Sequence, residues 1–467
     1  MSRFFSVLSL TVRSHVSRMG LLGMLALLAQ AAEAGELWLG IFLKGSKIGY
    51  SHTVSEIGHT TNLTMIDASM LGASLAVRSE SQTWYDSDGR TNKIWVKTES
   101  GGRVQSVTAK VKGSKVELES DNSGSITKKT VELPVGSRLV DDPVVSALDH
   151  PEWREFAVLD PNTLSFVVCR PVVVGKELLE TGSGKVSVTV IDVQDPRSAL
   201  KVYVSQKGDL VKAVGPFGLE MRPVSRAEAL AKGEETDIAL ASSIPVDRPI
   251  TDSMSVKPLF LRLHGAAAKI LPNDSHQTIN KSGDSLFVTI HPVDPRLVKW
   301  LKKAPTLAKW LSPDTHMPSQ DPGLVKVAQE TVGKSKTSRE KAEKLRLFVH
   351  NLIKTDTGIG VLRNAKEIFQ SRRGVCRDHA ILLATLLRTQ KIPCRLCSGL
   401  VYAGGAFYYH AWVEAWTGVQ WFALDSTRPP RQVDSTHIKT AQGTVAEAFS
   451  SFLLDGARVS VLDKEDK

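Results

Sequence analysis

The chain has little cysteine, no run of basic residues and no hydrophobic stretch long enough to span a membrane after its first residues. Four cysteines in 467 residues exclude a disulfide framework, which packs cysteines more densely into a shorter chain. The net charge of +10 is scattered as on an ordinary solvated surface, so we expect no nucleic-acid partner. No cluster of Asp, Asn and Glu has the spacing of a calcium cage, so we expect no metal and no cofactor.

The length and composition describe an ordinary globular protein with more than one domain. A chain of 467 residues exceeds the roughly 250–300 residues that a single hydrophobic core usually serves. Hydrophobic residues make up 42% and charged residues 23%, which is typical of soluble globular domains. We therefore expect two or three domains with proper cores.

The N-terminal 34 residues have the layout of a secretory signal. Arg3, Arg13 and Arg18 precede an apolar run over 19–29, and small residues two apart follow at Ala32–Ala34. The apolar run is shorter than the roughly 20 residues that span a bilayer, which favours a cleaved signal over an uncleaved anchor. We expect residues 1–34 to be a signal peptide, and the mature chain to be secreted or periplasmic without a membrane span.

From residue 35 to about residue 295 the hydrophobic pattern has period two and frequent turn signals. The run 37–43, for example, is followed by Gly45–Ser46 and by a partner run at 47–50. This pattern predicts an antiparallel β-rich domain over 35–245 and a linking β segment over 246–300. Acids, histidines and cysteines do not gather at catalytic spacing in this part, so we interpret it as a binding or positioning domain.

The pattern becomes helical near residue 295 and alternates again after Pro393. Asp321, Thr337 and Asn364 stand where helix N-caps are expected, and a helix with a wholly apolar stripe should start near Cys376. Three strands follow, within 394–401, 408–416 and 420–425. Helices followed by antiparallel strands predict an α+β fold for a catalytic domain over 301–467.

Cys376 is the candidate nucleophile. It follows Gly374 at the start of the apolar helix, where unpaired amide groups and the helix dipole stabilise a thiolate and can also donate to an oxyanion. A buried, unreactive cysteine is the commoner fate of a lone thiol, and it is the fate that we expect for Cys169, Cys394 and Cys397. Only partners of the right chemistry distinguish the two.

His410 and Asp425 supply such partners. His410 alternates in phase with Tyr408 and Trp412, and Asp425 ends the next strand in phase with Trp421. A short hairpin then places both side chains on one side of the sheet, where a carboxylate can fix an imidazole tautomer. Alone, each residue has an ordinary structural explanation, but with Cys376 they form a nucleophile–base–orienter set. For His379, three residues after the cysteine, we expect a supporting role.

Four segments together resemble the transglutaminase-like superfamily, whose core has a papain-like fold. These segments are Arg373–Ala380, Leu387–Arg395, Tyr409–Glu414 and Trp421–Thr427, and the resemblance covers about residues 320–440. The resemblance implies that Cys376, His410 and Asp425 are the catalytic Cys, His and Asp. Ser426 stands where the family often has proline. Gln370, six residues before the cysteine, has the spacing of the oxyanion-hole glutamine of papain-like enzymes, although a polar residue ending a short helix explains it equally well.

The activity that this resemblance implies is acyl transfer from a protein or peptide substrate. Cys376 would attack a carboxamide or peptide carbonyl, His410 would protonate the leaving amine, and water or an amine would resolve the thioester. Because water far exceeds amines in concentration, we expect hydrolysis by a cysteine protease or amidase more than cross-linking by a transglutaminase. The competing interpretation is a binding module that keeps the fold without the reaction.

Overall fold

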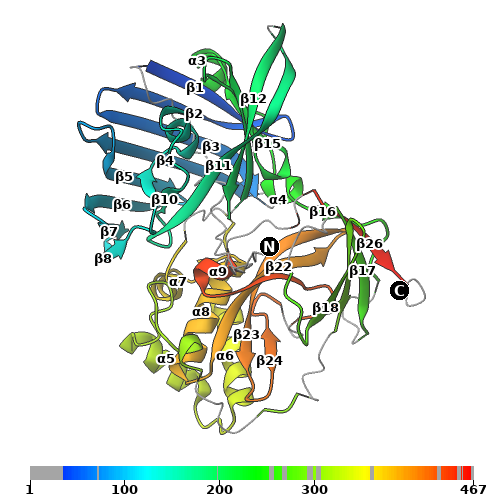
Figure 1. The fold of residues 1–467 in the computed structure, drawn as a ribbon. Coiled ribbons are helices and arrows are strands. Elements are labelled where there is room, and N and C mark those ends of the chain that lie inside the picture. Colours follow the sequence, from blue (N-terminus) through cyan, green and yellow to red (C-terminus); the bar gives the residue numbers. More distant parts are fainter. Residues whose placement is uncertain are drawn as a thin grey trace, which may run out of the picture.

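The computed structural model describes residues 35–70, 73–182, 184–196, 198–251, 257–265, 271–291, 298–300, 307–357, 362–428, 433–449, 454 and 456–463. The predicted signal peptide, residues 1–34, lies outside these residues. Within the described part, no helix is both long and apolar enough to cross a bilayer. Figure 1 shows a large N-terminal sheet, coloured blue to green, beside a unit of helices and strands coloured yellow to red.

The N-terminal half builds one sheet in which fifteen strands are described. Two meanders, β1–β8 and β9–β15, join where β1 pairs with β15, and only β9 and β10 run parallel. The strands are β1 (Gly35–Leu43), β2 (Ser46–Glu56), β3 (His59–Met70), β4 (Ala73–Tyr85), β5 (Thr91–Ser100), β6 (Arg103–Lys112), β7 (Lys115–Asn122), β8 (Ser125–Glu132), β9 (Arg138–Val140), β10 (Phe156–Asp160), β11 (Ser165–Thr181), β12 (Gly184–Asp195), β13 (Ser198–Ser205), β14 (Leu210–Val214) and β15 (Leu219–Pro223). Short helices accompany them: α2 (Pro143–Asp149), η1 (Pro216–Gly218), α3 (Arg226–Leu230) and α4 (Ile238–Ala241).

The hydrophobic alternation that predicted strands corresponds to an alternation of buried and partly exposed side chains. In β3, Thr60, Asn62, Thr64 and Ile66 are buried while the residues between them are partly exposed. Since successive side chains of a strand point to opposite faces, every second residue faces the interior of this curved sheet. The expectation of an antiparallel β-rich N-terminal region is therefore confirmed.

The second unit packs helices on a smaller sheet around α8. Every residue of α8 from Arg377 to Arg388 is buried, and this helix contacts β22, β23, α5, α6 and α7. The elements of this unit are η2 (Ala308–Trp310), α5 (Pro322–Val332), α6 (Ser338–Leu352), β20 (Lys354–Thr355), α7 (Ala365–Ser371), β21 (Arg373–Gly374), α8 (Cys376–Thr389), β22 (Cys394–Ala403), β23 (Ala406–Trp416), β24 (Trp421–Leu424), β25 (Ile438–Gly443) and α9 (Val445–Ala448).

The predicted helix starts are confirmed at atomic detail. The Asp321 carboxylate accepts from the amides of Gly323 and Leu324 at the start of α5. Thr337 and Asn364 each form a capping box with the glutamate three residues on, at α6 and α7. These side chains satisfy amides that a helix N-terminus leaves without an intrahelical partner.

A third sheet joins distant parts of the chain. Its strands lie in the order β18 (Gln277–Ser282), β19 (Ser285–Ile290), β17 (Leu259–His264) and β26 (Arg458–Leu462). The segment expected to link the domains thus pairs with the C-terminal strand, and it shares a hydrophobic cluster with Leu400 of β22, Phe407 of β23 and Ile438 of β25. A further strand, β16 (Ile244–Pro245), pairs directly with β23.

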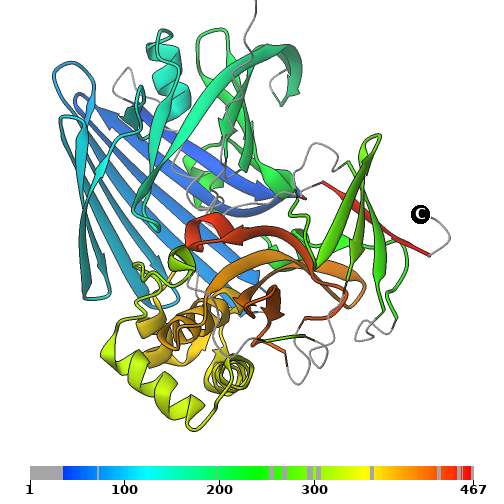
Figure 2. The same ribbon diagram turned by 60° about the horizontal axis from the view of Figure 1, so that its bottom comes forward.

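The N-terminal sheet also touches the second unit directly. Asn122 at the end of β7 donates a hydrogen bond to Glu367 of α7 at 3.1 Å. The ring of Phe217 packs edge-to-face against that of Tyr409 of β23, with 5.5 Å between the ring centroids. Figure 2 shows the blue and cyan strands as a broad curved layer alongside the yellow helices. These contacts fall on α7, which precedes α8, and on the middle of β23.

Candidate active site

The start of α8 is fixed by a buried ion pair. The Asp378 carboxylate accepts from the Val375 amide at 2.9 Å and pairs with Arg363 at 3.0 Å, both side chains being fully buried. Gly374 is required here, because a Cβ at this position would lie 2.6 Å from the Cβ of Asp378 and 2.9 Å from Arg363 Nη2. The first residue of the helix, Cys376, is thereby held with its thiol at the positive end of the helix dipole.

Cys376 differs from the other three cysteines in its exposure. It is partly exposed, whereas Cys169, Cys394 and Cys397 are fully buried, and none of the four forms a disulfide. Burial raises the pKa of the Cys394 and Cys397 thiols. The prediction that these two are core thiols is confirmed, and among the four cysteines only Cys376 combines access with a helix N-terminus.

His410 lies on β23, between two stretches where neighbouring strands pair with the same edge. On that edge of β23, β16 pairs at Ala406–Phe407 and β24 pairs at Val413–Trp416. His410 sits between the two pairings, with Nε2 at 2.9 Å from Asp425 Oδ2. Asp425 is the residue directly after β24, so strand register brings the two together as expected.

The imidazole of His410 bridges Asp425 and Cys376. Since Nε2 faces the carboxylate, Nδ1 is the nitrogen left for the hydrogen bond with the Cys376 thiol. Burial disfavours the imidazolium, but the charge and hydrogen bond of Asp425 and the contact with Cys376 outweigh it and raise the pKa of His410 to about 9. Burial also acts on Asp425, but His410 and a second histidine hold the pKa of that carboxyl well below its usual range. This arrangement favours a thiolate–imidazolium pair at neutral pH.

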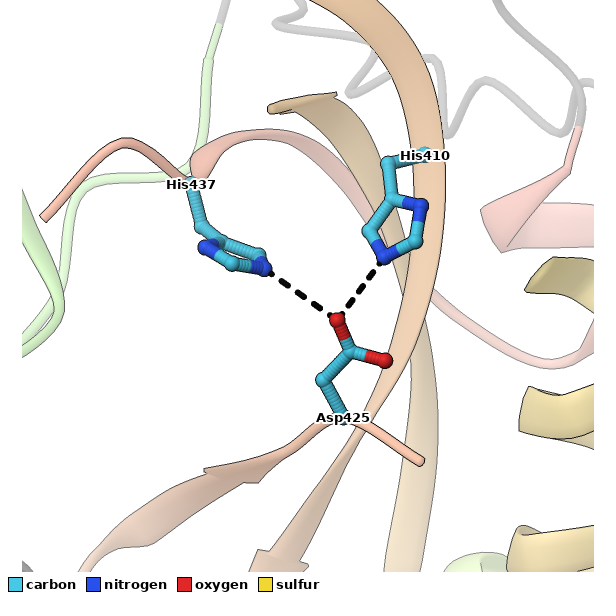
Figure 3. A group of neighbouring side chains, drawn as sticks. All are labelled: His410, Asp425 and His437. Carbon is cyan, nitrogen blue, oxygen red and sulfur yellow. Dashed lines mark hydrogen bonds and ion pairs between the residues drawn. The ribbon is translucent and has the colours of Figure 1, made fainter. Parts of the chain in front are cut away.

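Both oxygens of Asp425 are engaged. Oδ1 accepts from the amide and the hydroxyl of Thr427, each at 2.7 Å. Oδ2 faces His410 and also His437 Nε2, the latter at 3.4 Å, and Figure 3 shows both imidazoles directed at this one oxygen. The carboxylate is therefore held in one orientation, as an orienting acid must be.

Two residues singled out in the sequence lie beside this centre. His379 is buried, its Nδ1 is 3.4 Å from the Ser426 hydroxyl, and burial lowers its pKa to about 4. A neutral imidazole packed behind Asp425 fits the supporting role expected for it. Gln370 lies near the end of α7, and its place in an oxyanion hole stays a prediction.

Sequence reasoning missed His437 and its partner Asp434. His437 precedes β25, which pairs with β22. His437 Nδ1 lies 3.0 Å from Asp434 Oδ1, and both side chains are buried. A single sequence carries no motif for this pair, because residues 434–437 form a turn whose place beside Asp425 depends on tertiary packing.

A ring nitrogen of His410, a ring nitrogen of His437 and a carboxylate oxygen of Asp425 lie within 4.8 Å of one another. Two imidazoles with one carboxylate are also a donor set that zinc and related ions accept. The hydrogen bonds described above use the same three atoms, so an ion there would replace the contact between His410 and Asp425.

Comparison with known proteins agrees with the motifs. Residues 325–426 match the family model of the transglutaminase-like superfamily. This segment, which spans α6–α8 and β22–β24, is similar to a transglutaminase core, and the resemblance stated from the sequence is confirmed. Among curated proteins, no sequence matches the chain.

Three solved structures are similar to parts of the chain. A candidate cysteine protease from Cytophaga hutchinsonii is 18% identical, covers 45% of this chain and 87% of its own, and has a TM-score of 0.32. A β-barrel-like protein of unknown function from Brucella abortus is 11% identical, covers 40% and 93%, and has a TM-score of 0.31. A candidate protease from Parabacteroides distasonis is 12% identical, covers 72% and 69%, and has a TM-score of 0.21. At these TM-scores the likenesses carry no argument about this chain.

Proposed function

We propose that the protein is a thiol hydrolase that cleaves amide bonds of proteins or peptides through Cys376, His410 and Asp425. The observation that carries this proposal is the bridge made by His410, which hydrogen bonds Asp425 at 2.9 Å and the thiol of a helix-start cysteine. A nucleophile, a base and an oriented carboxylate in this order are the parts of a thiol triad.

In the proposed reaction, the Cys376 thiolate attacks the amide carbonyl and forms a tetrahedral oxyanion. Amides at the start of α8 are the nearest fixed donors for that oxyanion. His410 then gives its proton to the leaving amine, and the thioester forms as the C–N bond breaks. Water, deprotonated by His410, releases the acid and restores the thiol.

Hydrolysis and transamidation differ in the molecule that accepts the acyl group from the thioester, which is water or an amine. A partly exposed thiol outside the cytoplasm meets far more water than amine, which favours hydrolysis. We place the protein in the periplasm or outside the cell on the strength of residues 1–34 alone. N-terminal sequencing of protein recovered from cell fractions tests that location, and an intact Met1 on protein in the cytoplasm would contradict it.

The activity is tested with denatured protein and glutamine-containing peptides, with and without a primary amine. We expect new amino-termini or released ammonia, and at least a thousandfold loss in Cys376→Ala, since removal of a nucleophile usually costs that much. Cys169→Ala is the matched control, a buried cysteine on β11 of the N-terminal sheet. Incorporation of the amine without hydrolysis would make the protein a transglutaminase.

A binding module is the second candidate function. It predicts that Cys376 reacts with iodoacetamide near neutral pH no faster than an ordinary free thiol. We expect instead a rate well above that of a free thiol, because the ionised form is the nucleophile. Full alkylation of Cys376 without any faster phase would remove the basis of the enzymatic proposal.

A further inference from the structure

We propose that His437 and Asp434 are positioning residues that extend the triad beyond Asp425. This inference rests on the proposed function, because it assigns these residues a task in orienting Asp425. His437 is fully buried, and its two ring nitrogens face two different carboxylates, Asp425 Oδ2 at 3.4 Å and Asp434 Oδ1 at 3.0 Å.

Geometry defines where the protons of His437 lie. A carboxylate oxygen accepts but cannot donate, so both contacts are hydrogen bonds only when both ring nitrogens carry a proton. The Asp434 amide also lies 3.3 Å from Nδ1, but the carboxylate is closer and charged, and it decides the proton's position. His437 is thus held between two carboxylates, one at each ring nitrogen.

The side chains form a continuous line of contacts. The order is the thiol of Cys376, the ring of His410, the carboxylate of Asp425, the ring of His437 and the carboxylate of Asp434. Arg428 lies at the end of the line, 3.1 Å from Asp434 Oδ2. Each buried carboxylate therefore has hydrogen-bond donors beside it, which is the condition under which buried carboxylates are tolerated.

The protein also fixes the backbone that carries His437. His276 lies with Nε2 at 2.8 Å from the His437 carbonyl oxygen. Gln277 bonds both the amide and the carbonyl of Lys439, at 2.8 and 2.7 Å, as a neighbouring strand would. His437 is therefore held on both sides, by Asp434 within its own turn and by residues from the segment between the two large units.

The orienting effect acts through Asp425. Without His437, Oδ2 keeps only the bond to His410, so the carboxylate is oriented by that bond and by Thr427 on Oδ1 alone and is more readily protonated. The other charged or titratable groups near His437 are His410, His276, Lys439 and Arg428, and they remain in place. The thiolate–imidazolium pair is then weaker, and it forms only at higher pH.

The test follows the rate of Cys376 alkylation by iodoacetamide against pH on the full chain, which needs no knowledge of the substrate. We expect His437→Ala to lower the rate near pH 5–6 about tenfold, as for loss of one hydrogen bond to a charged group, and to move the acidic limb to higher pH. His437→Gln, which can still donate to Asp425, should recover most of the rate. Asp434→Asn should shift the limb in the same direction by less.

His264→Ala provides the control, a partly buried histidine on β17 that bonds Ser460 and lies outside the site. Its profile should superimpose on that of the unmodified chain. If His437→Ala lowers the melting temperature but leaves the pH profile unchanged, His437 is structural and the proposal is overturned. The proposal also fails if a chelator alone shifts the profile of the unmodified chain, because the cluster then holds a metal. A steep profile without any amide hydrolysis would instead refute the proposed function and leave the positioning role standing.

Discussion

The two large units of the molecule bury polar side chains in different chemical forms. On the inner face of the N-terminal sheet, Asn62 donates to Ser51 and Thr53 at 2.8 and 2.7 Å, and Thr64 joins them. In the second unit the largest buried polar clusters contain ionisable pairs: Asp378 with Arg363, Glu414 with Lys439, and Asp425 with two histidines. The cluster around Asn62 is neutral, and these three clusters contain ionisable side chains.

This difference distinguishes clusters that only stabilise the fold from clusters that can take part in a reaction. Neutral hydroxyls and amides satisfy one another over a wide pH range and can activate nothing. Buried ions hold each other's protonation state, and groups with perturbed pKa values concentrate at functional sites. The ion networks of the second unit are nevertheless of two kinds, because only that of Asp425 reaches a partly exposed thiol.

The largest expected effect is on activity, in Asp425→Asn. The amide keeps the shape but removes the charge that stabilises the imidazolium of His410, so we expect amide hydrolysis to fall by about 10²- to 10⁴-fold. Rates at saturating peptide measure this loss. Unfolding in urea should show a stable protein, which separates a chemical from a structural effect.

A second buried network should affect stability instead. Lys439 pairs with Glu414 at 2.6 Å and with Asp274 at 2.5 Å, and Arg395 also pairs with Glu414. Glu414→Gln leaves Lys439 buried with one partner fewer, so we expect unfolding free energy to drop by about 3–5 kcal/mol. Denaturant titration measures it. The double variant Glu414→Leu with Lys439→Met should lose less than the sum of the single changes, and strict additivity would contradict a coupled pair.

The sequence predicted local structure well in this second unit because the signals there are local. The N-caps at Asp321, Thr337 and Asn364 and the apolar stripe of α8 are read within a few residues. Phase along two hairpin strands was enough to bring His410 and Asp425 together, since register in a hairpin follows from alternation.

Features that depend on distant segments escaped prediction. His437 reaches Asp425 only because β25 returns beside β22, and the Asp274–Gln277 segment, more than 150 residues earlier, supports it. The pairing of β17 with β26 likewise joins the C-terminal strand to the segment that looked like a linker. Alternation predicts that a strand exists, but it does not say which strand lies beside it.

The pH dependence of activity should show directly how the ionised Asp425 cluster acts on His410. The pKa of His410 is raised to about 9, so the imidazolium is present below that pH and is lost as the pH rises through it. Activity should therefore fall on the basic side near pH 9. In Asp425→Asn, the strongest group that raises this pKa is gone, so residual activity should fall at lower pH. A basic limb that stays in place would show that another group sets it.

The smallest effect is expected in the neutral network. Asn62→Ala on β3 leaves the hydroxyls of Ser51 and Thr53 without the amide that donates to them, which costs about 1–2 kcal/mol for a buried polar group. The loss should be the same at pH 5 and pH 8, because no member of the network titrates there, and peptide hydrolysis should be unchanged. Urea titration at both pH values, with Thr61→Ala on the other face of β3 as control, measures it. A loss of stability that depends on pH, or a fall in activity, would show that the Asn62 cluster is coupled energetically to the charged residues of the second unit.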